Sequence, residues 1–166
     1  MSIHRLIIST IAFVVTVPAG FAADFPQFRG TNGQGHVQAT GLPVTWSGAD
    51  NVTWKVPVPG KGWSSPIILK GRLYLTTAVP KPGGDPDDQS LRTLCLDIKT
   101  GKTLWNREIF DRNHVPTTGL LHGKNSHASP TPASDGQFLY VHFGTEGTAC
   151  LELATGKIVW TSRALK

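Results

Sequence analysis

An eleven-residue phrase occurs twice in this chain of 166 residues, with an offset of 55 residues. The first copy runs from Cys95 to Trp105 and the second from Cys150 to Trp160, and both contain Thr-Gly-Lys before the final tryptophan. A recurrence of this length is typical of repeat proteins, in which one supersecondary unit is stacked several times. The chain is therefore expected to be built from repeated units.

Short apolar runs around each copy predict four antiparallel strands per repeat. The phrases 64–68 and 128–132 join small residues to proline and predict the first strand, and the runs 73–77 and 138–143 follow glycine turns and predict the second. The third and fourth strands flank the Thr-Gly turn. Four short antiparallel strands form one propeller blade, so the predicted fold class is all-β, with β-propeller blades at 64–106 and 128–166.

The residue types in the turn of each copy are those that close a tight hairpin. In the first copy, an Asp97 side chain can accept hydrogen bonds from the following amides, Thr100 stiffens the bend, and Gly101 takes the left-handed conformation. The second copy has Glu152, Thr155 and Gly156 at these positions, and the longer acid is expected to cap its turn less well. These residues are interpreted as structural.

The tryptophan that closes each copy is large and flat. Trp105 and Trp160 are therefore expected to pack between adjacent blades, burying on the order of 200 Å² each.

The number of repeats is too small for a closed ring. Trp54, within the N-terminal segment 24–63, predicts a lone outer strand at 51–55. Two blades and a stray strand fall short of the about 4 to 8 blades of a closed ring. We therefore expect an incomplete ring, with self-association, a partner chain that supplies the remainder, or a chain that is a fragment of a longer propeller.

Two long connections are rich in glycine, proline or polar residues: 79–90 and the inter-blade loop 107–127. Their composition predicts loops. Such insertions in repeat proteins tend to gather on one face, which is often the binding face.

The first 23 residues have the pattern of an export signal. A basic start is followed by an apolar run from Leu6 to Val17 and by small residues before Asp24. The run is too short to span a bilayer, which needs about 20 residues, so we expect a signal peptide at 1–23 and a periplasmic or extracellular protein. Without this leader the net charge is about +4, spread along the chain, which disfavours nucleic acid as a partner.

The only two cysteines, Cys95 and Cys150, hold the same position in the two copies. Equivalent strand positions of neighbouring blades fan apart, beyond the roughly 7 Å Cα separation that a disulfide tolerates. Two buried free thiols are expected, although an exported protein could form a disulfide.

Several polar residues are candidates for a metal site. His114, His122, His127 and His142 lack the spacing of a zinc or copper site. The acidic residues Asp85, Asp87 and Asp88 lack the spaced ligands of a calcium loop. No metal site is predicted from either group.

Candidate catalytic and ligand-binding residues are also few. Ser64 and Ser65 lack a glycine-flanked elbow, so no catalytic residue is predicted. A ligand-facing loop is the remaining hypothesis, and its alternative is inter-blade hydrogen bonding. The four residues of that loop are His122, Lys124, Asn125 and His127.

The phrase C-x-D/E-x-x-T-G-x-x-x-W, with Ser-Pro strands before it, resembles the pyrroloquinoline-quinone-like (PQQ-like) β-propeller repeat. The start 24–33 and the loop 124–130 are similar to exported bacterial propellers of this group, although that repeat usually has alanine where this chain has Cys95 and Cys150. The resemblance covers roughly residues 24 to 166. It implies the fold but does not by itself fix an activity.

The resemblance implies two functional classes. One class contains propellers that bind proteins without catalysis, and the other contains quinone-dependent dehydrogenases that hold the quinone and calcium on the axis of eight blades. The dehydrogenases carry a pair of adjacent cysteines, which this chain lacks. We therefore expect a non-catalytic binding or scaffold module without a cofactor. The alternatives are a fragment of a PQQ-dependent quinoprotein dehydrogenase, with quinone and calcium, or a truncated remnant.

Overall fold

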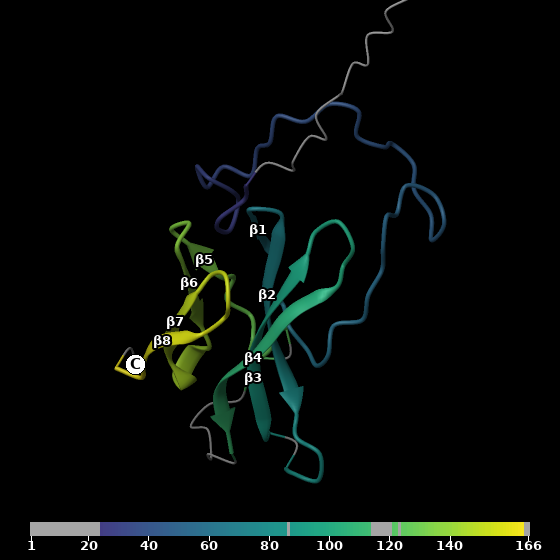
Figure 1. Cartoon of the computed structure of the whole chain (residues 1–166). Helices are drawn as coiled ribbons and strands as arrows, with labels where there is room; N and C mark the ends of the chain where they lie inside the picture. The colour runs from purple at the N-terminus through teal and green to yellow at the C-terminus, as the bar shows by residue number, and fades with distance from the viewer. Residues whose placement is uncertain (1–23, 86, 114–120, 123, 165–166) are drawn as a thin grey trace, which may run out of the picture.

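Two four-stranded antiparallel sheets make up the fold and lie next to each other (Figure 1). The computed structural model describes residues 24–85, 87–113, 121–122 and 124–164, so the signal peptide predicted at 1–23 lies outside the described residues. Apart from one 3-10 turn, all regular structure in these ranges is β, as the sequence predicts. No helix in the described ranges has the length and apolar character needed to cross a membrane.

Each sheet is a propeller blade whose strands follow one another in chain order. Blade 1 has the order β1-β2-β3-β4 and blade 2 the order β5-β6-β7-β8. The strands of blade 1 are β1 (Ile67–Leu69), β2 (Arg72–Pro80), β3 (Gln89–Asp97) and β4 (Thr103–Arg112). Those of blade 2 are β5 (Ala133–Ser134), β6 (Phe138–His142), β7 (Thr148–Glu152) and β8 (Ile158–Ser162), with the 3-10 turn η1 (Gly144–Glu146) between β6 and β7.

The turn between β3 and β4 has the chemistry that its sequence predicts. Oδ1 of Asp97 accepts hydrogen bonds from the amides of Lys99 and Thr100 and from the Thr100 hydroxyl, at 3.1, 2.9 and 2.8 Å. These bonds, above all those from Thr100, lower the pKa of Asp97. Gly101 closes the turn with a φ of 71°. In blade 2, the Glu152 carboxylate accepts from the Thr155 hydroxyl at 2.8 Å.

The two blades share one apolar core. Directly paired strand residues lie on the same face of a sheet, so Tyr74, Cys95 and Trp105 occupy one face of blade 1, which we call its far face. The opposite face is the near face. The far face of blade 1 packs against the near face of blade 2, which contributes Leu139 and Leu151 to the same buried cluster.

β4 extends six residues beyond the predicted end of the first repeat at position 106. The pairing with β3 continues to Gln89–Arg112 through a register shift between Leu91 and Arg92. Phe110 is buried and meets Phe143 of blade 2 edge to face, at 6.0 Å between ring centroids. The inter-blade loop predicted from residue 107 therefore begins after β4, because this packing keeps the strand extended.

The outer strand predicted at 51–55 is not formed, since these residues belong to no strand. They pair with none of the described strands. The N-terminal segment instead runs across the top of the molecule and down beside blade 1 (Figure 1). It is attached by two isolated bridges, Phe25 with Ile68 and Lys61 with Ala78.

We predict that Gly156→Ala lowers the free energy of unfolding by about 2–5 kcal/mol. Gly156 has a φ of 68°, and a Cβ there would lie 2.7 Å from Trp105 Cδ2. The new methyl group would therefore add overpacking, about 1–3 kcal/mol, to a left-handed backbone penalty of about 1–2 kcal/mol. Urea unfolding followed by circular dichroism measures the loss.

The matched control for this substitution is Gly83→Ala. Gly83 has nearly the same φ, 72°, but a Cβ there would meet nothing within 4 Å. It should lose only the backbone penalty of about 1–2 kcal/mol. Equal losses of stability in the two variants would show that the packing of Trp105 does not require a glycine at position 156.

Candidate functional site

The contact between the blades depends on a tryptophan placed on a glycine turn. The ring of Trp105, in β4 of blade 1, lies against Gly156 in the β7–β8 turn of blade 2. The same contact occurs one repeat earlier, where Trp54 lies against Gly101 and a Cβ would be 2.6 Å from Trp54 Cε3. The expectation that the closing tryptophans pack between adjacent blades is confirmed for Trp105. It is not met by Trp160, which is 44% exposed because no described blade follows blade 2.

The polar bonds of these two contacts differ. Nε1 of Trp54 donates to the Ile98 carbonyl at 2.8 Å. In the next turn the equivalent carbonyl belongs to Leu153 and accepts the Tyr74 hydroxyl at 3.2 Å, whereas Nε1 of Trp105 is buried without a hydrogen-bond partner. Tyr74 and Trp105 are also in ring contact, with centroids 5.8 Å apart. Burial raises the pKa of Tyr74, which keeps this hydroxyl protonated as a donor.

A third tryptophan of the same kind is exposed on blade 2. Trp160 in β8 is 44% exposed, and its ring centroid is 6.4 Å from that of Tyr140, as Trp105 accompanies Tyr74. Register places Tyr140, Cys150 and Trp160 opposite one another on the far face of blade 2. This face therefore has the residues that join the blades but lies open in the described structure.

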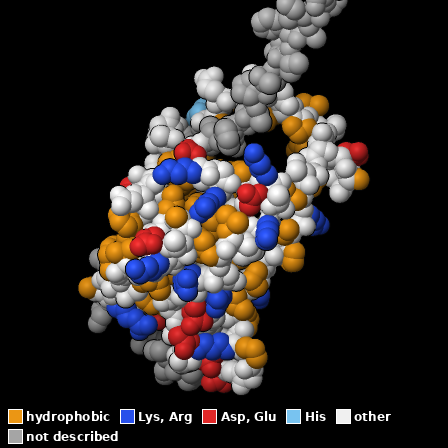
Figure 2. Space-filling view, in the orientation of Figure 1, with side chains coloured by type: hydrophobic (Ala, Val, Ile, Leu, Met, Phe, Trp, Pro, Cys, Tyr) orange, Lys and Arg blue, Asp and Glu red, His pale blue; other side chains and the backbone are white. Residues whose placement is uncertain are grey.

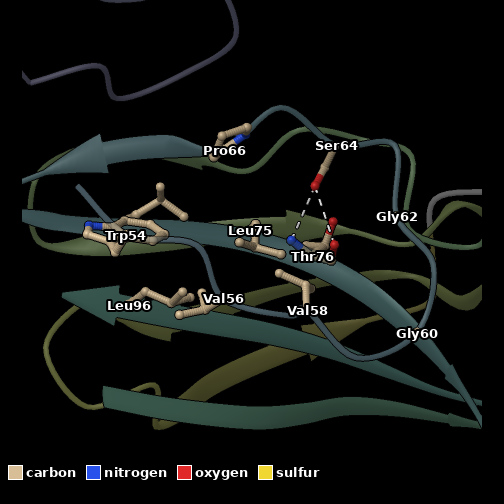
Figure 3. A pocket seen from close by; sticks show the side chains of 11 residues that line it. Trp54, Val56, Val58, Gly60, Gly62, Ser64, Pro66, Leu75, Thr76 and Leu96 are labelled. Atoms are coloured by element: carbon tan, nitrogen blue, oxygen red, sulfur yellow. Dashed lines mark hydrogen bonds between the residues drawn. The ribbon is translucent and has the colours of Figure 1, made fainter. Parts of the chain in front are cut away.

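A cleft of about 350 Å³ lies on the near face of blade 1, under the segment of residues 54–66, which we call the strap. Trp54, Val56 and Val58 project from the strap toward β2 and β3 (Figure 3). Ser64 ties the strap to β2 through hydrogen bonds with the backbone of Thr76 (Figure 3). The floor of the cleft is apolar and is formed by Leu73, Leu75 and Leu96.

The other half of the near face is polar. A second groove, of about 360 Å³, is lined by Ser90, Arg92, Asn106 and Glu108 among others. Arg92 donates to Asn106 Oδ1 at 2.7 Å and forms an ion pair with Glu108 at 3.3 Å. On the face seen in Figure 2, Lys and Arg side chains are interspersed with Asp and Glu rather than gathered in one block.

The structure separates the residues of the predicted ligand-facing loop into two environments. His122, Lys124 and Asn125 are exposed, and the amides of Lys124 and Asn125 donate to His122 Nδ1 and to its carbonyl oxygen, at 3.2 and 2.7 Å. His127 is partly buried. Desolvation, followed by the nearby charge of Arg112, lowers its pKa against the opposing influence of Asp87 and Glu146.

A buried ion pair lies beside His127, and no sequence motif predicts it. Arg112, at the end of β4, is 2% exposed and donates through Nη1 to Glu146 of η1. Its Nε and Nη2 atoms are buried without a hydrogen-bond partner. Arg112 and Glu146 are 34 residues apart and belong to different blades, so the pair links the two blades. Only the packing of β4 against blade 2 brings them together.

A quinone–calcium group would need six to eight oxygen ligands for its calcium. Within the described ranges, no three His, Cys, Asp or Glu side chains converge. The carboxylate of Glu146 is bound by Arg112, and Oδ2 of Asp88 accepts the amide of Asp85 at 3.1 Å. His114, the remaining histidine of the predicted metal candidates, lies outside the described residues.

Both cysteines are free and buried. Burial raises the pKa of Cys95 to about 11 and raises that of Cys150 as well. Because the thiolate is the reactive form, these thiols act as apolar packing groups at neutral pH.

Four-stranded antiparallel sheets that pack through a tryptophan on a Thr-Gly turn define a β-propeller-repeat protein. The particular family follows from comparison with known sequences. The PQQ-like repeat model described as outer membrane protein assembly factor BamB matches residues 35–162, so the chain belongs to this PQQ-like repeat family. A search of curated proteins found no match.

We predict that Arg112→Met lowers the free energy of unfolding by about 3–5 kcal/mol, because it leaves the Glu146 carboxylate buried without its counter-charge. The double variant Arg112→Met/Glu146→Met should recover most of this loss, since both charges are then replaced by apolar groups. Urea unfolding at pH 7 measures both. A loss as large in the double variant as in the single one would contradict a role for the charge pair.

We also predict that the free energy of unfolding decreases as the pH is lowered, because of His127. Its pKa is lowered in the folded state, so as pH falls the unfolded chain takes up a proton first. The contribution is complete above the unfolded pKa of about 6.5 and is lost as pH falls toward the folded pKa. Urea midpoints at pH 7.5 and 5.5 should therefore differ less for His127→Gln than for wild type. Asn125→Ala, a non-titrating change in the same loop, should keep the wild-type difference.

Proposed function

We propose that this protein is an exported, non-catalytic PQQ-like repeat module that binds or scaffolds other proteins through its blade faces. The observation that carries the proposal is the open far face of blade 2. There Trp160 is 44% exposed in the position that Trp105 uses to join the two blades. A large aromatic residue beside a tyrosine is the kind of anchor that protein interfaces use.

Two further observations support a binding role. The matching family model is described by the name of an assembly factor of the outer membrane, and a comparable non-catalytic role is proposed for this chain. The buried thiols and the Arg112–Glu146 pair stabilise the fold rather than presenting a reactive group at the surface. The proposed partner is a protein surface that offers a glycine turn beside apolar side chains.

Export is part of the same proposal. The pattern of residues 1–23, with a basic start, an apolar run and small residues before Asp24, is the support for a cleaved signal peptide. A periplasmic or extracellular location follows from that interpretation.

We predict no dehydrogenase activity for the purified protein supplied with the quinone and calcium. A dye-linked assay with alcohols and sugars should give the same rate with and without quinone, because the described side chains do not gather ligands for calcium. A quinoprotein dehydrogenase assayed in parallel verifies the reagents. Turnover that requires both quinone and calcium would overturn the non-catalytic proposal and favour the dehydrogenase class.

A further inference from the structure

We infer that the far face of blade 2 binds the near face of blade 1 in a second copy of this chain, where Trp160 replaces that copy's Trp54 on the Thr100–Gly101 turn. The inference rests on the proposed binding function and names its partner. The complementary surface is already present in the chain, because blade 1 and blade 2 join through the same kind of contact.

The contact between the blades specifies what each side must supply. The far face of blade 1 supplies Tyr74, Cys95 and Trp105 in one row across β2, β3 and β4. The near face of blade 2 supplies Gly156 and apolar residues of β6 and β7 such as Leu151. A second contact of this kind therefore needs the same tyrosine–cysteine–tryptophan row and the same glycine turn.

The first of these surfaces is the open far face of blade 2. Tyr140, Cys150 and Trp160 pair across β6, β7 and β8 in the register that Tyr74, Cys95 and Trp105 have in blade 1. The ring separation of Tyr140 and Trp160 is 6.4 Å, close to the 5.8 Å of Tyr74 and Trp105. Trp160 nevertheless remains 44% exposed.

The second surface is the near face of blade 1. Leu73 and Leu96 pair there as Leu139 and Leu151 pair in blade 2, and Gly101 closes the turn as Gly156 does. The carbonyl of Ile98 is the acceptor equivalent to that of Leu153, which binds the Tyr74 hydroxyl. The hydroxyl of Tyr140, which now donates to Asp135 Oδ2 at 2.9 Å, is the equivalent donor.

Among the described residues, the strap is the segment that lies over this second surface, and it covers it incompletely. It leaves the cleft of about 350 Å³ above the leucines. Val52 and Val58 on either side of Trp54 are 40% and 41% exposed. The Trp54 end of the strap is held by its ring and its hydrogen bond to Ile98, whereas the other end is fastened by the bridge of Lys61 with Ala78 and by Ser64. A complete blade would bury more apolar surface there, and burial is the main favourable term in association.

Both faces also carry polar residues beyond these rows. On the far face of blade 2, His142 and Thr148 pair with each other and with Ser162, in the row next to Trp160. On the near face of blade 1, Asn106 lies in the row next to Leu73 and Leu96, and Arg92 pairs with Glu108 one row further.

The resulting association is head to tail, because the two surfaces differ. Head-to-tail contacts form rings where the rotation closes and open chains where it does not.

The test is sedimentation velocity of the full chain over a range of concentrations, with a set of tryptophan variants. Trp160→Ala should weaken self-association at least about tenfold, as expected for a central aromatic anchor. Trp54→Ala should strengthen it, because it removes the group that occupies the acceptor turn. Trp54→Phe, which keeps a ring but loses the bond to Ile98, should strengthen it to a smaller extent. Trp46→Ala is the matched control, since Trp46 is 72% exposed and has no equivalent in the contact.

The opposite responses of Trp160→Ala and Trp54→Ala would support the inference. Self-association through a non-specific apolar surface would not become stronger when Trp54 is removed. Three outcomes would overturn it: a chain that stays monomeric in both wild type and Trp54→Phe, an association insensitive to Trp160→Ala, or one weakened equally by Trp46→Ala. Each of these leaves the quinone assay unaffected, so failure of the inference and failure of the proposed function are distinguishable.

Discussion

The close approach of an indole ring to a glycine turn sets how the blades meet. Gly156 must be glycine for two reasons, because its φ is positive and because Trp105 occupies the space of a Cβ. A ring can lie this close to the backbone only where the turn has a fixed shape. The Asp97–Thr100 hydrogen bonds provide that shape in the first turn, and the Glu152–Thr155 bond does so in the second. The repeated phrase is therefore as much an interface motif as a hairpin motif.

The three related tryptophans differ in how well their polar atoms are satisfied. Trp54 donates to a turn carbonyl, whereas Trp105 has a buried Nε1 without a partner and the equivalent carbonyl accepts the Tyr74 hydroxyl instead. An unsatisfied buried donor costs about 1–3 kcal/mol. The tyrosine hydrogen bond and the ring contact between Tyr74 and Trp105 offset this cost. The tyrosine thus belongs to the contact between complete blades, and the strap reproduces that contact only in part.

Sequence reasoning predicted the features that depend on local chemistry. The all-β class, the two blades and the turn bonds of Asp97 follow from short motifs, and the structure confirms them. The position of Trp105 between blades could also be predicted, since a large flat residue recurred at the same place in each unit. The predicted strand around Trp54 was wrong because a strand needs an edge to pair with, and the repeat pattern does not say whether one is available.

What sequence reasoning missed depends on packing between segments distant in the chain. The extension of β4 to Arg112 follows from a register shift and from the contact of Phe110 with Phe143, neither of which has a motif. The same extension carries Arg112 about seven residues beyond Trp105, or roughly 23 Å along the strand. The contact between the blades is therefore fastened at two separate places, by the indole on its glycine and by the buried ion pair with Glu146. The strap shares the first of these, since Trp54 lies on the Gly101 turn. In place of the ion pair it has backbone hydrogen bonds between Lys61 and Ala78 and the bonds of Ser64 with Thr76.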